Sequence, residues 1–316
     1  RVTFTPSYDA MIRSLVDLRA LRRLRGTVVH DPMGGVQLGR LDAVLRGLPL
    51  RIVRIHDRLD PMFCGLDAPE PVEKNLRELM EAVPRHRALL GIATDGDGDR
   101  VGIVSNDGTT LSPHLIYALL LLFMIRERKL TGGVVKTVSG SFLLDRIARA
   151  HGLELHETPV GFKHNCRLMR EDDILMGGEE SGGFAFKGHI PERDGLLAGL
   201  FFLELLARTG KTCAQLVRDL AKEFGNSSYG RIDAHVPGAS RVLARIVAAP
   251  PAGIAGLRVA RVNTRDGLKL IMPDDSWLLF RASGTEPLLR VYAEAGTPKR
   301  MRALLAAGDR LAAAGR

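Results

Sequence analysis

Three aspartates stand at alternate positions in the segment TDGDGDRVGIV, residues 94–104, with glycines between them and an arginine directly after. Asp95, Asp97 and Asp99 repel one another unless a cation neutralises them, and the glycines let the backbone curl so that their oxygens converge. Carboxylate oxygens are the preferred ligands of hard divalent ions such as Mg²⁺. The segment therefore predicts a magnesium site that leaves room for a phosphate oxygen, and metal-assisted phosphoryl transfer as its chemistry.

Two other interpretations of this loop compete with the magnesium site. An EF-hand calcium loop also begins D-x-D-x-D, but it requires glycine at its sixth position and glutamate at its twelfth, where this sequence has Arg100 and Asn106. That mismatch excludes the calcium loop. A polar turn with solvated aspartates stays open, because Asp-Gly pairs commonly form turns.

A second polar loop, GGEESGG at residues 177–183, places Glu179 and Ser181 among glycines. A carboxylate and a hydroxyl with spare hydrogen-bonding capacity suit the vicinal hydroxyls of a sugar. A plain glycine-rich turn explains the same residues, so this loop alone leaves both interpretations open.

A third loop, RASGTEP at residues 281–287, has the groups of an anion site. A guanidinium fork, two hydroxyls and exposed backbone N–H groups together suit a phosphate monoester. The alternative is a surface turn with an incidental arginine. The segment lacks the GxxxxGK[ST] pattern of a nucleotide P-loop. The candidate phosphate-binding residues are Arg281, Ser283, Gly284, Thr285 and Arg290.

Apolar periodicity predicts the elements that must hold these loops. In the first third, strands are expected at 26–31, 50–55, 88–95 and 100–104, and helices from residue 6 and at 37–46 and 71–83. The pattern then restarts, with helices at 112–128, 141–151, 164–170 and 193–208, strands at 132–138 and 153–159, and a strand, loop and strand within 173–186. The apolar helix at 193–208 is expected to close the second domain.

Both units end in a strand, a polar glycine-rich loop and a second strand, which indicates a repeated architecture. From residue 228 the pattern changes to short alternating strands, and a helix follows from Pro298. The expected fold class is α/β, with two repeated mixed α/β sandwich domains followed by a small α+β domain with an antiparallel sheet. The expected domains are 1–108 with the metal-binding loop, 109–227 with the sugar-binding loop, and 228–316 with the phosphate-binding loop.

Composition narrows the class of partner. The 316 residues carry a formal charge of +9, yet the basic residues are dispersed and aromatic residues make up only 5%, which argues against nucleic acid. A small anionic substrate suits the positive charge equally well. The longest apolar run, residues 115–125, is too short to cross a bilayer and predicts a core helix, so no membrane partner is expected.

The amino terminus has no apolar segment of a signal peptide. The cysteines, Cys64, Cys166 and Cys213, are far apart and form no CxxC pair. This spacing argues against a disulfide framework or a zinc site and favours a cytoplasmic protein. The sequence begins with Arg1 rather than methionine, which favours a processed or truncated chain.

Taken in order, TDGDGDR, GGEESGG and RASGTEP resemble the metal, sugar and phosphate loops of the α-D-phosphohexomutase superfamily, which includes phosphoglucomutase and phosphomannomutase. DPMGG, DPMFCG at residues 60–65 and RDGLLAG resemble its connecting segments, and the resemblance extends over essentially all of the chain. It implies an enzyme that interconverts hexose 1-phosphate and hexose 6-phosphate through a hexose 1,6-bisphosphate, with Mg²⁺ and a phosphoserine donor.

The resemblance also implies roles for individual residues. Asp95, Asp97 and Asp99 would hold the metal, and Arg100 would lie near the transferring phosphoryl group. Glu179 and Ser181 would bind sugar hydroxyls, and the residues of the third loop with Arg290 would hold the non-reacting phosphate. Lys136 and Lys163 resemble basic residues that face the substrate; ordinary strand-end and loop cations are the alternative.

The resemblance leaves out the family's first domain. That domain carries the phosphoserine in a T-x-S-H-N-P-type loop, and no Ser-His-Asn occurs in these 316 residues. The SPH triplet at 112–114 begins an apolar helix and is no substitute. We therefore expect a truncated mutase that is catalytically inactive on its own, because binding loops without a donor cannot provide the covalent step.

Two other functions remain as alternatives: a donorless protein that binds sugar phosphates, and a Mg²⁺-dependent phosphatase with Asp95 at a strand end as nucleophile. Gly182 and Gly183, where some relatives carry Gly-His, favour glucose, with mannose as a second substrate. The oligomeric state is left open.

Overall fold

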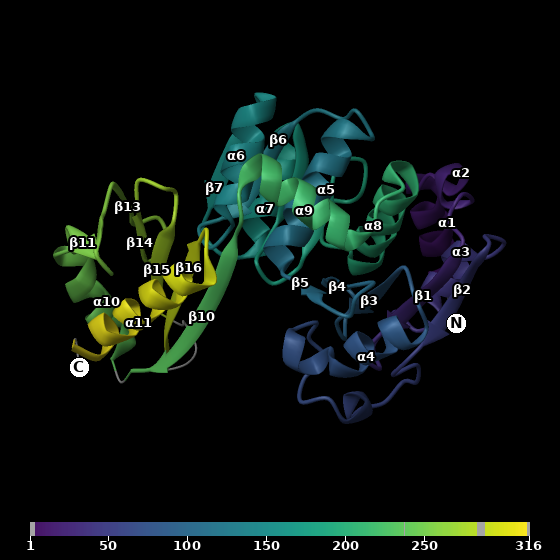
Figure 1. Cartoon of the computed structure of the whole chain (residues 1–316), viewed down its shortest axis with the longest axis horizontal. Coiled ribbons are helices and arrows are strands. Elements are labelled where there is room, and N and C mark those ends of the chain that lie inside the picture. Colours follow the sequence, from purple (N-terminus) through teal and green to yellow (C-terminus); the bar gives the residue numbers. More distant parts are fainter. Residues whose placement is uncertain (1–3, 237, 283–287, 315–316) are drawn as a thin grey trace.

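Three β-sheets, one after another along the chain, form the framework of the computed structural model, which describes residues 4–236, 238–282 and 288–314. In Figure 1 the second sheet lies in the middle, the third sheet on the left and the first sheet at the lower right. Two α/β units followed by an antiparallel sheet are the fold class that the sequence predicts, and the fold confirms it.

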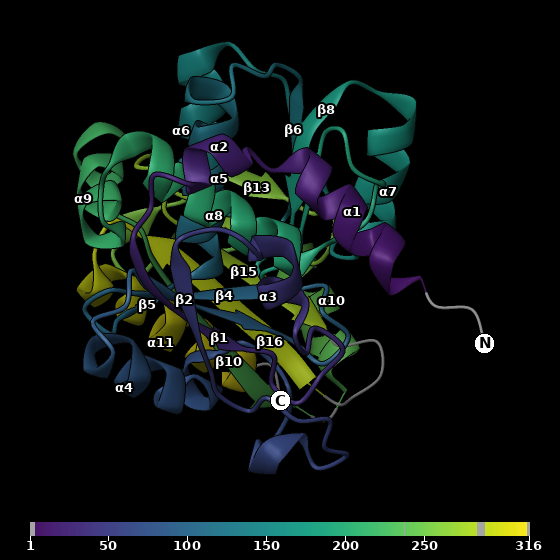
Figure 2. The same cartoon turned by 90° about the vertical axis from the view of Figure 1, so that its right-hand side faces the viewer.

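The first sheet has the strand order β2-β1-β3-β4-β5, in which β2, β1 and β3 are parallel and the last two strands are antiparallel. Its strands are β1 (Gly26–Asp31), β2 (Leu50–Arg54), β3 (Leu90–Thr94), β4 (Val101–Ser105) and β5 (Thr110–Leu111). The inner strands are apolar on both faces because α4 and α8 cover them from opposite sides (Figure 2). Its helices are α1 (Thr5–Leu15), α2 (Leu18–Leu21), α3 (Arg40–Leu45) and α4 (Arg77–Arg85), with short 3₁₀ turns η1 (Phe63–Gly65) and η2 (Glu73–Asn75).

The second sheet repeats this plan with the order β7-β6-β8-β9: three parallel strands and a final antiparallel one. Its strands are β6 (Gly133–Thr137), β7 (Leu155–Thr158), β8 (Ile174–Gly178) and β9 (Phe184–Phe186). Its helices are α5 (Pro113–Arg126), α6 (Phe142–His151), α7 (Phe162–Glu171) and α9 (Cys213–Phe224). In both units the polar loop joins the last parallel strand to an antiparallel strand, so the two loops occupy equivalent places.

The helix that was expected to close the second unit also covers the first sheet. Helix α8 (Gly195–Thr209) does not simply close that unit, because it packs against β3 and β4 of the first sheet as well as against α5 and β9. A helix that is apolar on all sides is buried on all sides. Helices α5 and α8 therefore form a shared layer between the two sheets, and this layer fixes the position of one polar loop relative to the other.

The predicted domain boundaries stay predictions. Strand β5, at residues 110–111, pairs with β4 and so extends the first sheet beyond residue 108. Within the described ranges, no helix combines the length and apolar character needed to cross a bilayer.

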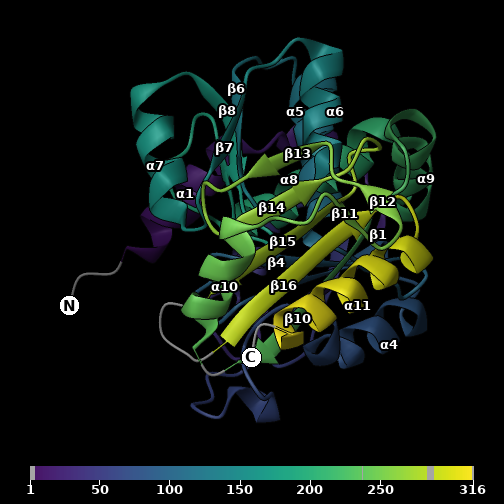
Figure 3. The ribbon, with the colours of Figure 1, turned by 90° about the vertical axis from the view of Figure 1, so that its left-hand side faces the viewer.

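The third sheet is entirely antiparallel, with the order β10-β16-β15-β14-β13. Its strands are β10 (Ser228–His235), β13 (Arg261–Asn263), β14 (Leu268–Ile271), β15 (Trp277–Ala282) and β16 (Leu288–Ala295), beside a separate hairpin of β11 (Gly253–Ile254) and β12 (Leu257–Arg258). Helices α10 (Ala239–Ala248) and α11 (Pro298–Ala314) cover one face (Figure 3). Side chains alternate along β15: Leu278 and Phe280 pack beneath these helices, whereas Trp277 and Leu279 join the core of the second unit.

A buried carboxylate anchors the third sheet to the second unit. Glu294, on β16, is fully buried and accepts hydrogen bonds from the Ser141 hydroxyl, the Phe142 backbone N–H at 2.8 Å and the Trp277 indole N–H at 2.8 Å. The hydroxyl of Ser227, just before β10, donates a fourth at 2.5 Å. These donors come from the start of α6, from β15 and from the segment joining the two domains, so one side chain ties three segments together.

We expect Glu294→Gln to lower the free energy of unfolding by about 2 kcal/mol, because the amide would direct N–H groups at donors and leave buried hydrogen bonds unmade. Urea denaturation followed by tryptophan fluorescence measures this, since Trp277 contacts the side chain. Glu223→Gln is the control, because Glu223 pairs with Arg126 at the surface; its effect should stay below about 1 kcal/mol. Equal effects for both variants would contradict the anchoring role.

Candidate functional site

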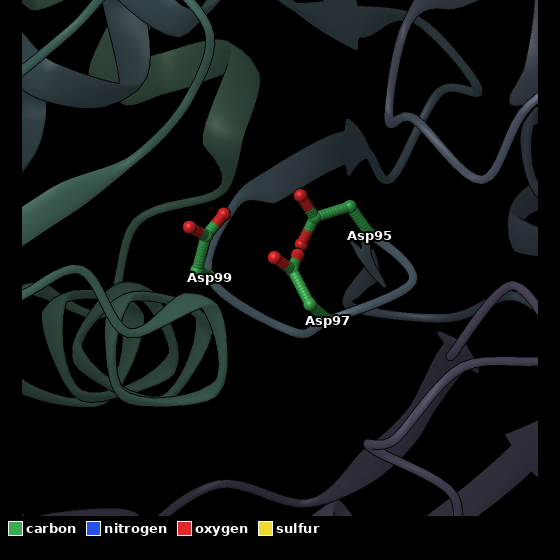
Figure 4. Close-up of side chains that lie close together, drawn as sticks. All are labelled: Asp95, Asp97 and Asp99. Atoms are coloured by element: carbon green, nitrogen blue, oxygen red, sulfur yellow. The ribbon is translucent and has the colours of Figure 1, made fainter. Parts of the chain in front are cut away.

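The three aspartates of the first loop converge. Ligand oxygens of Asp95, Asp97 and Asp99 all lie within 4.8 Å of one another, and Figure 4 shows the carboxylates gathered around the loop between β3 and β4. The neighbouring backbone presses closely on this loop: a Cβ on Gly35 would lie 2.5 Å from the carbonyl oxygen of Gly96. Within the part of the chain that the structure describes, the buried Oδ1 of Asp99 accepts no hydrogen bond, which leaves it available to a cation. This all-oxygen donor set fits Mg²⁺.

Burial and repulsion between the carboxylates both make ionisation of Asp95 and Asp99 costly. Burial, together with the charges of Asp99 and Asp97, raises the pKa of Asp95 from its ordinary value of 3.8 to about 7, although a hydrogen bond from the Arg100 backbone opposes the shift. Burial also raises the pKa of Asp99, and the charge of Arg193 opposes that rise. A bound divalent ion would relieve the same repulsion.

Arg100 lies directly against the aspartates. Its Nε is 3.4 Å from Oδ2 of Asp95 and 3.7 Å from Oδ1 of Asp99, and its backbone N–H donates to Asp95 at 2.9 Å. On its other side the guanidinium is 3.4 Å from Glu70. Arg100 also lines a cleft between the three sheets, so its charge faces both the aspartates and the space in which a ligand could lie.

Backbone hydrogen bonds join the first and second polar loops. The N–H of Val101 donates to the carbonyl of Gly182 at 3.0 Å, and Arg100 and Gly183 form an isolated antiparallel bridge. Glu179 is buried beside this junction, where its Oε1 accepts from the N–H of Gly161 at 3.0 Å. Burial, assisted by the neighbouring charge of Glu180, raises the pKa of Glu179.

Arg193 bridges the two loops, and its role was not predicted from the sequence. Its Nη2 lies 2.5 Å from Oδ2 of Asp99 and its Nη1 lies 3.6 Å from Oε2 of Glu179, while the guanidinium stacks over the Phe162 ring at 5.0 Å. In the sequence, Arg193 is the first residue of RDGLLAG, a segment that was identified only by its resemblance to a connecting segment. One cation therefore balances carboxylates that come from two domains.

A cleft of about 1120 Å³ lies between the three sheets, and five of the predicted site residues line it: Arg100, Glu179, Ser181, Arg281 and Arg290. Ser181 lines it with a buried hydroxyl that has no hydrogen-bond partner among the described residues. From the third sheet, Arg281 and Arg290 stand directly opposite each other on β15 and β16. Like charges in direct cross-strand pairs destabilise a sheet, so this pair favours a bound anion. Lining residues that were not singled out from the sequence include Glu180, Arg193, Arg231 and Tyr292.

Two predicted cations lie elsewhere. Lys136, which was expected to face the substrate, is not among the residues that line the cleft: its side chain is only 3% exposed and pairs with Asp145 and with Glu157. Lys163 is exposed on α7 and lines a neighbouring hollow of about 690 Å³, which shares Phe162 and Arg193 with the main cleft. The predicted phosphate-loop residues Ser283, Gly284 and Thr285 lie outside the described residues.

Comparison with known proteins shows the family of the chain. Residues 6–108, 112–224 and 241–310 match family models for α/β/α domain II, α/β/α domain III and the C-terminal domain of phosphoglucomutase/phosphomannomutase. The chain therefore belongs to the phosphoglucomutase/phosphomannomutase family.

Two curated relatives show how much of a full-length family member this chain spans. It is 33% identical over 304 residues to the phosphoglucomutase/phosphomannomutase of Thermococcus kodakarensis, covering 96% of this chain and 64% of the relative. It is 30% identical over 290 residues to the phosphoglucosamine/phosphogalactosamine mutase of Sulfurisphaera tokodaii, covering 92% of this chain and 62% of the relative. The chain thus spans less than two thirds of either relative.

Solved structures of other proteins share the fold of this chain. A phosphomannomutase-family protein from Thermus thermophilus matches with a TM-score of 0.86 and 34% identity, covering 98% of this chain and 66% of that one. At the level of fold alone, the N-acetylphosphoglucosamine mutase of Aspergillus fumigatus, solved with GlcNAc-6P and magnesium, matches with a TM-score of 0.67 and 18% identity, covering 98% and 70%.

We expect Mg²⁺ to stabilise the chain more at high pH than at low pH. The pKa of Asp95 is higher in the folded chain than in the unfolded one, so without metal its ionisation destabilises the fold as pH rises from its ordinary pKa to about 7. Mg²⁺ competes with these protons and removes that loss. At 100 times its Kd the ion should add about 2.7 kcal/mol near pH 8, and less than half of this near pH 5.5.

Thermal unfolding with and without MgCl₂ measures this effect. Asp97→Asn should abolish the Mg²⁺-dependent shift. Asp67→Asn, at an exposed carboxylate of the same domain, should leave it unchanged. A shift that is independent of pH, or one that survives Asp97→Asn, would contradict the assignment of the metal site.

Proposed function

We propose that this chain binds Mg²⁺ and a hexose phosphate, and that it forms the metal-, sugar- and phosphate-binding part of a phosphohexomutase. The reaction would interconvert hexose 1-phosphate and hexose 6-phosphate through a hexose 1,6-bisphosphate. The observation that supports this most strongly is the shared cleft, since Arg100, Glu179, Ser181, Arg281 and Arg290 come from three domains and line one cavity.

Each group has a chemical task in this proposal. The metal ion, held by the aspartate loop, would neutralise charge on the phosphoryl group being transferred. Arg100 would hold an oxygen of the same group. Glu179 would accept hydrogen bonds from the sugar hydroxyls, and Ser181 would donate a hydrogen bond to one of them. Arg281 and Arg290 would hold the phosphate that does not react. A bisphosphate that exchanges its two ends between transfers needs an anion-binding group for each phosphate, and Arg100 from the first domain and Arg281 and Arg290 from the third would supply them.

The covalent step requires a phosphoryl donor. No Ser-His-Asn occurs in these residues, so we propose that the chain by itself binds substrate without converting it. Glucose phosphate is the favoured ligand, and mannose phosphate is the second. One relative is named a phosphoglucosamine/phosphogalactosamine mutase, which adds glucosamine and galactosamine phosphates to the candidate ligands. Binding measurements with each sugar phosphate distinguish these candidates.

A ³¹P NMR time course with glucose 1-phosphate, a trace of glucose 1,6-bisphosphate and Mg²⁺ tests the function. We expect the substrate signal to shift or broaden without formation of glucose 6-phosphate. Glucose 6-phosphate, in a preparation free of host mutase, would place a donor within this chain. Release of inorganic phosphate that is abolished by Asp95→Asn but not by Arg281→Ala would instead favour the phosphatase.

We expect Arg281→Ala to weaken glucose 1-phosphate binding about tenfold or more, because charged hydrogen bonds contribute about 1.5–3 kcal/mol. Arg258→Ala is the matched control, since Arg258 lies on the β11–β12 hairpin of the same domain, away from the cleft. Isothermal titration calorimetry measures both. Equal affinities for the two variants would contradict phosphate binding by Arg281.

A further inference from the structure

Arg281 is held by a carboxylate that the proposed function leaves without a role. Asp266, in the turn between β13 and β14, accepts a hydrogen bond at Oδ2 from the Arg281 Nε at 3.0 Å. The same oxygen accepts from the backbone N–H of Val160 at 2.8 Å. Val160 follows β7 of the second unit, so one carboxylate oxygen joins the phosphate-binding domain to the sugar-binding domain.

The next residue continues this connection. The N–H of Gly161 donates to Oε1 of Glu179 at 3.0 Å. Two successive backbone N–H groups thus donate to two different carboxylates, one beside the phosphate-binding arginine and one in the sugar loop. Gly161 has φ of +129°, a conformation that side-chain-bearing residues rarely adopt, which explains glycine at this position.

The connection extends as far as the metal loop, because Arg193 contacts both Glu179 and Asp99. A continuous series of polar contacts therefore runs from Arg281 through Asp266 and the Val160–Gly161 backbone to the aspartates. Together the contacts join segments of all three domains, and none of the participating side chains is fully exposed.

We propose that Asp266 is a positioning residue, which fixes the distance between the phosphate-binding Arg281 and the sugar-binding Glu179. This inference rests on the proposed function, because it takes those two residues as the binding groups for the two parts of a hexose phosphate. When this distance is fixed in advance, a ligand that spans both groups binds with a smaller loss of conformational entropy. The affinity for a ligand that contacts only one of the groups does not change.

Direct binding of the substrate phosphate by Asp266 is excluded by its chemistry and its place. A carboxylate repels a phosphate dianion, and Asp266 contacts Arg281 but is not among the residues that line the cleft. Its negative charge even offsets part of the attraction that Arg281 exerts on an anion. Removing Asp266 therefore affects a free phosphate and a sugar phosphate in different ways.

The chain supplies a matched control for this role. Asp275 also joins the third sheet to the second unit, through Arg146 on α6 at 3.0 Å, but neither partner lines the cleft. Asp275→Asn and Asp266→Asn each neutralise one carboxylate at the same domain interface. Only Asp266→Asn disturbs the connection between Arg281 and Glu179.

The experiment compares two probes in metal-free buffer by isothermal titration calorimetry: inorganic phosphate and glucose 1-phosphate. In the unsubstituted chain, glucose 1-phosphate should bind more tightly than inorganic phosphate. Asp266→Asn should lower this preference about tenfold, with the affinity for inorganic phosphate unchanged or increased. Asp275→Asn should leave the preference unchanged, and thermal unfolding confirms that each variant is folded.

A second variant separates position from charge. Asp266→Glu keeps the negative charge but moves the carboxylate by one methylene group, so it should also lower the preference for glucose 1-phosphate. Equal weakening of both probes by Asp266→Asn, or an unchanged preference in both variants, would overturn the positioning role. Equal affinities of the unsubstituted chain for the two probes would overturn the proposed sugar binding itself, together with the inference built on it.

Discussion

Three carboxylates whose oxygens lie within 4.8 Å of one another repel, and much of the neighbouring structure offsets that repulsion. Arg100 approaches the aspartates from the loop itself, and Arg193 approaches them from the segment before α8. Neither cation saturates the available oxygens, since burial and repulsion still raise the pKa of Asp95. A divalent ion bound to this loop, as proposed above, would relieve the remaining repulsion.

The loop can serve a site only if the second and third loops are placed against it. The shared layer of α5 and α8 does this for the second loop, because both sheets pack on the same two apolar helices. The buried Glu294 does it for the third sheet through donors from α6 and the joining segment. Apolar packing fixes the first pair, whereas the third sheet is held both by apolar side chains such as Trp277 and Leu279 and by the hydrogen bonds of Glu294.

Much of the fold and part of the site could be predicted from local patterns. Buried strands such as β3 and β8 are short apolar runs that end in polar loops, and the aspartate spacing alone indicates a metal. Helix α9 was missed, although Thr212 and Gln215 form a capping box that marks its start. The position of α8 could not be predicted, because a helix that is apolar on every face carries no information about which sheet it covers.

Side chains that act across domains were the hardest to predict. Lys136 and Arg193 are both cations next to apolar segments, yet one is buried in ion pairs within the second unit and the other bridges two loops. What distinguishes them is which carboxylates the tertiary fold brings within reach: Asp145 lies on α6 of the same unit, whereas Asp99 follows a strand of the first sheet. A loop motif records the groups that would contact a ligand. The residues that set the distances between loops have no motif, since their partners come together only when all three sheets are in place.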